Sequence, residues 1–139
     1  MHSSSIRLQS MNGTEWIVDA RGCSAQSLRS MELLRRLFDA IIAELELQTI
    51  GEMQWHQFPG TGGITGLCLL SESHLACHTF PEFGSLCLNL FCCVSRPRWD
   101  FESRLAERFS ATSVRVREVI REYSADAEFE PLRLAREER

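Results

Sequence analysis

Reactive side chains are concentrated in one stretch of this 139-residue chain, from Ser71 to Cys93. Hydroxyls, imidazoles and thiols are the groups that proteins use as nucleophiles, general bases and general acids. On a strand, the four residues from His74 to His78 cover about 13 Å, which is too far for one metal ion. The stretch contains Ser71, Ser73, His74, Cys77, His78, Cys87, Cys92 and Cys93. We therefore expect acid–base or nucleophilic chemistry without a metal. Serine is also common in turns, and cysteine is also common in hydrophobic cores, so each of these residues has a purely structural alternative.

The chain contains no lysine, because all 15 of its basic residues are arginine. Pyridoxal phosphate is held as a Schiff base on a lysine amine, and P-loop phosphate sites also use a lysine. Both kinds of site are therefore excluded, as is a lysine nucleophile. If the protein acts on amines through a carbonyl group, that carbonyl must have another origin.

The charge and hydropathy of the chain exclude several classes of partner. The formal charge is −4 and the pI is about 5.6, without the basic character of a nucleic-acid-binding protein. No apolar run approaches the ~20 residues that span a bilayer, and residues 1–10 lack the apolar segment of a secretory signal. We expect a cytoplasmic protein that binds neither nucleic acid nor membrane and keeps its six cysteines as thiols.

Hydrophobic periodicity predicts the elements that must position the reactive groups. Apolar residues spaced by three and four predict a helix over 28–47, with Ser24 as the N-cap, and Pro97 opens a second helix that extends to about Phe109. Alternation and composition predict strands at 14–20, 52–58, 65–70, 74–80, 85–94 and 114–123.

Short connections determine how these strands pair. Residues 71–73 and 81–84 each separate two consecutive strands, and turns this short require antiparallel neighbours. We therefore predict an α+β two-layer sandwich, in which helices pack on one face of an antiparallel β-sheet. Residues 1–123 form this single domain, and residues 124–139 form a charged C-terminal tail.

Four segments of the chain together resemble one enzyme family. They are LSESHLACHTFPEFG at positions 70–84, LFCC at 90–93, WHQF at 55–58 and GITG at 63–66. The Glu-Ser-His run, followed by His-Thr-aromatic-Pro-Glu and then a cysteine twenty residues after the serine, resembles the prokaryotic S-adenosylmethionine decarboxylase proenzymes. The resemblance covers residues 14–123. It implies a self-processing enzyme that carries a pyruvoyl group, which accounts for the missing lysine.

The resemblance also implies a role for each matching residue. The chain is expected to cleave itself between Glu72 and Ser73, so that Ser73 becomes the pyruvoyl group that forms a Schiff base with the substrate. His78 matches the base of this processing, and Thr65 matches the hydroxyl that stabilises its oxyanion. Cys93 matches the proton donor of the decarboxylation, a role that suits a thiol because an ordinary cysteine is mostly protonated at neutral pH.

The same resemblance implies a small-molecule substrate and an assembly. Glu82 matches the carboxylate that binds the ribose hydroxyls, and Phe58 matches the aromatic ring that stacks on the adenine. The reaction releases CO₂ from S-adenosylmethionine and gives the aminopropyl donor for spermidine synthesis. Members of the family pair their cleaved subunits as (αβ)₂ or larger, with active sites across the dimer contact, so we expect the same here.

Several residues depart from the family pattern and leave alternatives open. Asn89 stands where many members have Asp, Cys92 replaces the commoner Thr, Val94 replaces a Gly and Thr65 replaces a Ser. None of these changes removes a group that the pyruvoyl chemistry needs, but several could reshape the pocket. A pyruvoyl-dependent arginine or ornithine decarboxylase therefore stays an alternative, as does a regulatory paralogue that does not process itself.

Overall fold

The structure is a computed structural model that describes residues 12–134. Its six strands are β1 (Asn12–Arg21), β2 (Gln54–Gln57), β3 (Ile64–Leu70), β4 (Ser73–Phe80), β5 (Ser85–Cys92) and β6 (Ser113–Glu122). Its helices are α2 (Ala25–Leu28), α3 (Met31–Glu44), α4 (Phe101–Phe109) and the 3₁₀ turn η1 (Pro81–Phe83). All six predicted strands are present, with ends that differ by one or two residues. The predictions for residues 1–11 and 135–139 lie outside the described residues.

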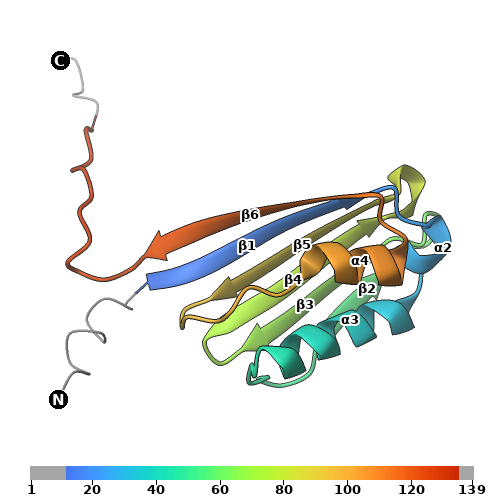
Figure 1. Cartoon of the computed structure of the whole chain (residues 1–139), viewed down its shortest axis with the longest axis horizontal. Helices are drawn as coiled ribbons and strands as arrows, with labels where there is room; N and C mark the ends of the chain where they lie inside the picture. The colour runs from blue at the N-terminus through green and yellow to red at the C-terminus, as the bar shows by residue number, and fades with distance from the viewer. Residues whose placement is uncertain (1–11, 135–139) are drawn as a thin grey trace.

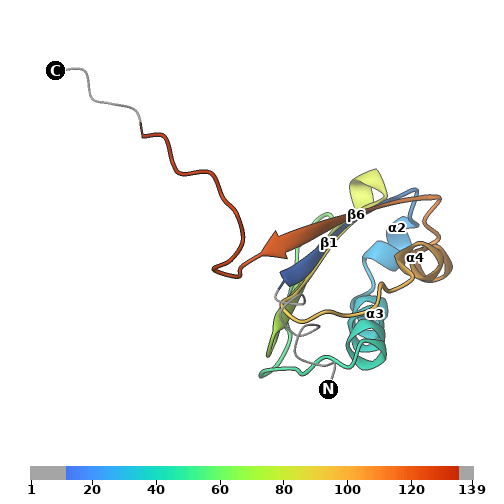
Figure 2. The same ribbon diagram turned by 60° about the vertical axis from the view of Figure 1, so that its left-hand side comes forward.

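One antiparallel sheet in the order β2-β3-β4-β5-β1-β6 forms a layer of its own. Helices α2, α3 and α4 cover one face of it, as the two views in Figures 1 and 2 show. The burial of β3, β4 and β5 alternates strictly, because successive side chains of a strand point to opposite faces. The predicted α+β two-layer sandwich with helices on one face is therefore confirmed.

Ser30 divides the helix that the sequence predicts over 28–47. Ser24 caps α2 as expected, since its side chain accepts a hydrogen bond from the Ser27 backbone N–H. Ser30 has extended backbone angles and caps a new helix, α3, by accepting from the Leu33 N–H. The prediction of one continuous helix was wrong because Ser30 starts a new helix, while the spacing of apolar residues continues unchanged across it.

The second predicted helix begins later than Pro97. Asp100 is the N-cap of α4, and its side chain accepts a hydrogen bond from the Ser103 N–H. Residues 97–99 instead form an extended connection that buries Trp99 against the core. An aspartate at the N-cap positions a carboxylate against the unpaired N–H groups of the first turn, which sets the helix start more strongly than the proline does.

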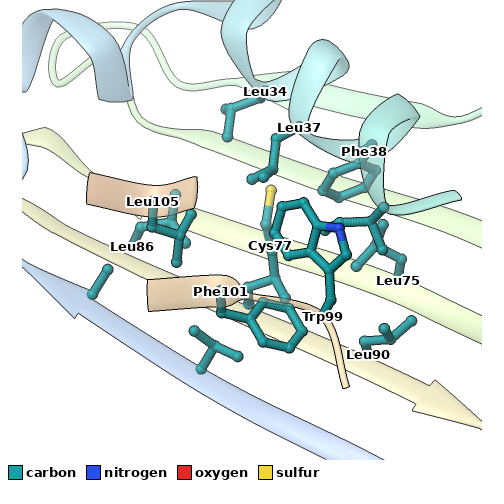
Figure 3. Close-up of a cluster of buried hydrophobic side chains, with 14 of the residues drawn as sticks. Leu34, Leu37, Phe38, Leu75, Cys77, Leu86, Leu90, Trp99, Phe101 and Leu105 are labelled. Carbon is teal, nitrogen blue, oxygen red and sulfur yellow. The ribbon is translucent and has the colours of Figure 1, made fainter. Parts of the chain in front are cut away.

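The core fills the space between the helices and the covered face of the sheet. Figure 3 shows side chains from α3, from β4 and β5, and from the α4 region meeting there. They include Leu34, Leu37, Phe38, Leu75, Cys77, Leu86, Leu90, Trp99, Phe101 and Leu105, all buried. Each fully buried large side chain contributes about 1.5–3 kcal/mol, so this layer holds β4 and β5 rigidly in place. No helix in the described part of the chain is long and apolar enough to cross a membrane.

Candidate active site

The hairpin between β3 and β4 exposes the peptide bond at which cleavage is predicted. Ser71 and Glu72 form the turn, and Ser73 is the first residue of β4. Ser73 pairs with Leu70 on one side and with Cys92 on the other. The neighbouring strands therefore fix the backbone on the C-terminal side of the Glu72–Ser73 bond, while the turn leaves the other side accessible.

A backbone donor binds the carbonyl group of that peptide bond. The Cys93 N–H donates to the Glu72 carbonyl oxygen with an N···O distance of 2.7 Å. A donor at this position polarises the carbonyl and stabilises negative charge that develops on its oxygen. The turn is held from its other side by the Ser71 N–H, which donates to the Gln48 carbonyl oxygen at 2.9 Å. Sequence reasoning missed the Cys93 N–H, because residue types carry no signal for a backbone donor.

A small pocket surrounds the turn at the end of the sheet, beside the chain that leaves α3. It is lined by Leu47, Gln48, Ser71, Glu72, Ser73, Cys92, Val94 and Arg96. Cys92 is buried, and burial raises the pKa of its thiol to about 11, although the charge of Arg96 and a hydrogen bond with Ser73 act in the opposite direction. At neutral pH Cys92 is therefore a neutral thiol beside the Ser73 hydroxyl.

Cys93 lies one residue beyond the end of β5 and is half-buried. Its carbonyl oxygen accepts a hydrogen bond from the Tyr123 hydroxyl at 3.0 Å. Its N–H and C=O are thus both bound, to Glu72 and Tyr123, which holds its backbone beside the cleavage turn. The structure thus brings the backbone of Cys93 to Glu72 and Ser73, whereas the thiol that lines the pocket among the described residues is that of Cys92.

Thr65 and His78 form a second cluster on the uncovered face of the sheet. They are direct cross-strand partners on β3 and β4. The Thr65 hydroxyl and the His78 Nδ1 atom are 3.0 Å apart, within hydrogen-bond distance. His78 is exposed, so its ring has room to meet a group from outside its own chain.

The structure does not bring Thr65 and His78 to Ser73 within one chain. Ser73 and His78 are five residues apart on the same strand, which corresponds to about 16 Å. An odd spacing also places the two side chains on opposite faces of the sheet. Thr65 is separated in the same way, because it pairs with His78 while Leu70 pairs with Ser73.

The two predicted substrate-binding residues lie at the His78 end of the sheet. Phe58 follows β2 and is 49% exposed. Its N–H donates to the Gly63 carbonyl oxygen at 2.8 Å, so it closes the glycine-rich loop, and its ring meets His56 edge-on at 4.7 Å. Glu82 is exposed on η1, directly after the end of β4. Both side chains are accessible to a ligand, and neither lies at the cleavage turn.

Known proteins resemble this chain in sequence and in fold. The family model described as S-adenosylmethionine decarboxylase matches residues 14–122. The chain belongs to this family. The S-adenosylmethionine decarboxylase proenzyme of Acetivibrio thermocellus is 34% identical over 113 residues, which cover 78% of this chain and 87% of that protein. The proenzyme of Moorella thermoacetica is 32% identical over 110 residues, with 78% and 86% covered.

A solved structure supports the fold independently. The crystal structure of the adenosylmethionine decarboxylase from Aquifex aeolicus superimposes with a TM-score of 0.67 at 19% identity, and the match covers 87% of this chain and 99% of that one. The identification from the motifs is thus confirmed at the level of family and fold. The roles of Ser73, His78, Cys93, Thr65 and the other single residues stay predictions.

Proposed function

We propose that this chain is a self-processing S-adenosylmethionine decarboxylase that cleaves itself between Glu72 and Ser73. The observation that carries the proposal is the 2.7 Å hydrogen bond from the Cys93 N–H to the Glu72 carbonyl oxygen. It prepares one particular peptide bond for attack, and that bond precedes the one serine that the family relationship designates. The two relatives described above are named proenzymes, which is consistent with a chain that is cleaved to give the active enzyme.

Cleavage begins with the chain's own groups. The Ser73 hydroxyl attacks the Glu72 carbonyl carbon, and the Cys93 N–H stabilises the negative charge that forms on the carbonyl oxygen. The peptide C–N bond breaks, an ester bond to the serine oxygen forms, and the proton of the hydroxyl passes to the released amine. The ester then eliminates, which releases fragment 1–72 with Glu72 as its end and leaves Ser73 as dehydroalanine. Hydrolysis of the dehydroalanine releases ammonia and gives the pyruvoyl terminus of fragment 73–139.

The residues around Ser73 fit a pyruvoyl group. When present, it supplies a ketone that condenses with the substrate amine and takes up the electrons released with CO₂. Cys93 is the proton donor for the carbon that loses CO₂, since its backbone is fixed beside the turn and it is half-buried. Cys92 adds no charge beside Ser73, because its thiol does not ionise at neutral pH.

We further propose that each active site combines two copies of the chain. Thr65 and His78 lie too far from Ser73 to act on it within one chain, yet they form a hydroxyl–imidazole pair that is open to a partner. The uncovered sheet face around them also exposes apolar side chains, with Leu67 at 47% and Leu69 at 58%. Pairing two copies through this face would bury these groups and supply each cleavage turn with its base and oxyanion donor.

Substrate recognition then comes from the copy that provides His78. Phe58 offers an exposed ring on which an adenine can stack, and Glu82 offers a carboxylate that can accept hydrogen bonds from ribose hydroxyls. We also propose a cytoplasmic location, which the six free thiols favour, because a reducing compartment keeps thiols unpaired.

Intact-mass analysis together with a substrate comparison tests the proposal. We expect two fragments that meet between residues 72 and 73, with a carbonyl-blocked terminus on the second, and release of CO₂ from S-adenosylmethionine. Turnover of arginine or ornithine alone would overturn the substrate assignment while leaving the mechanism. A single 15.9 kDa species after long incubation would instead indicate a regulatory paralogue.

A further inference from the structure

Arg96 is a charged residue of the cleavage pocket that has no role in the reaction described so far. It lies four residues beyond the end of β5 and lines the pocket together with Glu72 and Ser73. Its Nε atom is buried and has no hydrogen-bond partner among the described residues. One terminal nitrogen donates to the adjacent Ser95 carbonyl oxygen at 3.3 Å. A buried N–H of a cation without an acceptor is unfavourable, so a ligand that accepts from it is expected.

The charge of Arg96 acts inside the pocket. It lowers the pKa of the Cys92 thiol, although the larger effect of burial raises it. Cys92 is the direct cross-strand partner of Ser73, so the guanidinium lies near the reacting residue. Among the described residues no carboxylate forms an ion pair with Arg96. The pocket therefore holds a positive charge that no carboxylate of the described residues contacts directly, although Glu72 lines the same pocket.

Self-cleavage creates a negative charge at this place. After the ester has formed between the Glu72 carbonyl carbon and the Ser73 oxygen, a base removes the proton on the Ser73 α-carbon. The electron pair forms a double bond between the α- and β-carbons, and the bond from the β-carbon to oxygen breaks. The leaving group is the α-carboxylate of Glu72. The remaining dehydroalanine rearranges to an imine, and water hydrolyses this imine to the ketone with release of ammonia.

We propose that Arg96 stabilises this leaving carboxylate and holds it afterwards as the C-terminus of fragment 1–72. The inference rests on the proposed function. A guanidinium presents two parallel N–H donors that match the two oxygens of a carboxylate. It also suits a pocket that generates a ketone, because a lysine amine in its place could condense with the product.

The test measures processing of the full chain from the moment of its synthesis. Pulse-labelled protein from a cell-free translation system is chased, and the uncleaved, ester and cleaved forms are quantified. We expect Arg96→Gln to slow elimination about 10- to 100-fold, the effect of losing one charge-assisted interaction. Arg98→Gln is the matched control, because Arg98 is exposed and pairs with Glu102 at 3.0 Å, and it should process at the wild-type rate.

Hydroxylamine identifies the step that is slowed. At neutral pH it cleaves an ester while ordinary peptide bonds stay intact, so accumulated ester would release fragment 73–139 with an N-terminal serine. Its known cleavage of Asn–Gly bonds, here Asn12–Gly13, would give fragments of different mass. We expect this fragment from Arg96→Gln and not from the wild type, and we expect Arg96→Lys to restore only part of the rate, because it keeps the charge but not the paired N–H donors. Circular dichroism and thermal unfolding of the variants show that the fold is retained.

Two results would overturn the role of Arg96. If the wild type cleaves and Arg96→Gln cleaves at the same rate, the carboxylate needs no guanidinium, and the proposed function still stands. If Arg96→Gln is slow but no ester accumulates, the residue acts on an earlier step. A wild-type chain that never cleaves would instead remove the proposed function, and the role of Arg96 with it.

Discussion

The two ends of strand β4 carry different halves of the predicted chemistry. At its start, Ser73 lies beside the buried Cys92 and the backbone of Cys93, in a pocket on the side of the helices. Towards its other end, His78 and Thr65 face away from the helices, and His78 is exposed. The first end contains the bond to be broken, but the adjacent imidazole, His74, points to the other face of the sheet, where it lies 3.2 Å from the Asn89 side chain. The second contains an imidazole and a hydroxyl without a bond to act on.

This difference favours the proposal that one chain is half of a working unit. A strand is rigid, and five residues of it separate the two clusters by about 16 Å, so side-chain motion cannot join them. A second copy can, because a symmetric dimer presents the second end of each chain to the first end of the other. Phe58 and Glu82 fit the same division, since both lie with His78.

The largest expected effect comes from removing the nucleophile at the first end. Ser73→Ala should abolish both cleavage and decarboxylation, because an alanine has no hydroxyl to attack the Glu72 carbonyl. Intact-mass analysis should then show a single 15.9 kDa chain. Ser71→Ala, in the same turn, is the control and should cleave normally. Cleavage of the Ser73 variant at the usual place would refute the assignment.

The next largest effect should distinguish self-cleavage from decarboxylation, the two reactions that depend on the start of β4. Cys93→Ala keeps the backbone N–H that binds the Glu72 carbonyl oxygen, so cleavage should survive at least in part. Turnover of S-adenosylmethionine should fall about 10²- to 10³-fold, because a general acid contributes on that order. CO₂ release and the identity of the product are the measurements. Cys68→Ala, on the core side of β3, is the control and should have little effect on turnover. If the Cys93 variant keeps its full turnover, Cys92 becomes the candidate proton donor.

A smaller effect is expected midway along β4, beside Asn89, which stands where many members of the family have Asp. The Asn89 amide donates to Glu15 at 2.7 Å and is the largest cause of the lowered pKa of that carboxyl, which Arg121 also lowers. A lowered pKa means that this contribution to stability is present at neutral pH and is lost as the pH falls below about 4.5, the ordinary value. Asn89→Ala should therefore cost about 1–2 kcal/mol at pH 7.

Urea denaturation between pH 7 and pH 4 measures this cost. The difference between Asn89→Ala and the wild type should shrink as Glu15 takes up its proton. Combining Asn89→Ala with Glu15→Gln in a double-mutant cycle measures the interaction between the two side chains. The loss in the free energy of unfolding of the double variant should be smaller than the sum of the two single losses. Cleavage should continue in both variants, because neither side chain lies at an end of β4. A difference that grows on acidification would contradict the account.

The sequence predicts the sheet well and the helices less well. Strict alternation along β3, β4 and β5 has one interpretation, since each strand has one covered face. Helix ends depend instead on single hydrogen bonds. Ser30 and Asp100 start α3 and α4, and neither is visible in apolar spacing, which continues through Ser30 and begins before Asp100.

The candidate site was predictable as a set of residues and not as an arrangement. The motif at positions 70–84 predicts roles for Ser73 and His78, but a motif does not say that a spacing of five residues along one strand keeps them apart. The Cys93 N–H has no sequence signal, because every residue other than proline has one. Arg96 stands outside the family motif, so only its place in the pocket distinguishes it from the other arginines.

Co-expression of two inactive variants tests the shared site most directly. In a mixed dimer of Ser73→Ala and His78→Ala chains, one of the two sites combines an intact Ser73 with an intact His78. Random pairing should restore about a quarter of the wild-type decarboxylase activity, and only the His78→Ala chain should be cleaved. Ser73→Ala paired with Cys93→Ala is the control, because both changes affect the same end of β4, and no rescue is expected. Absence of rescue in the first pair, in dimers shown to be mixed, would contradict a site built from two copies.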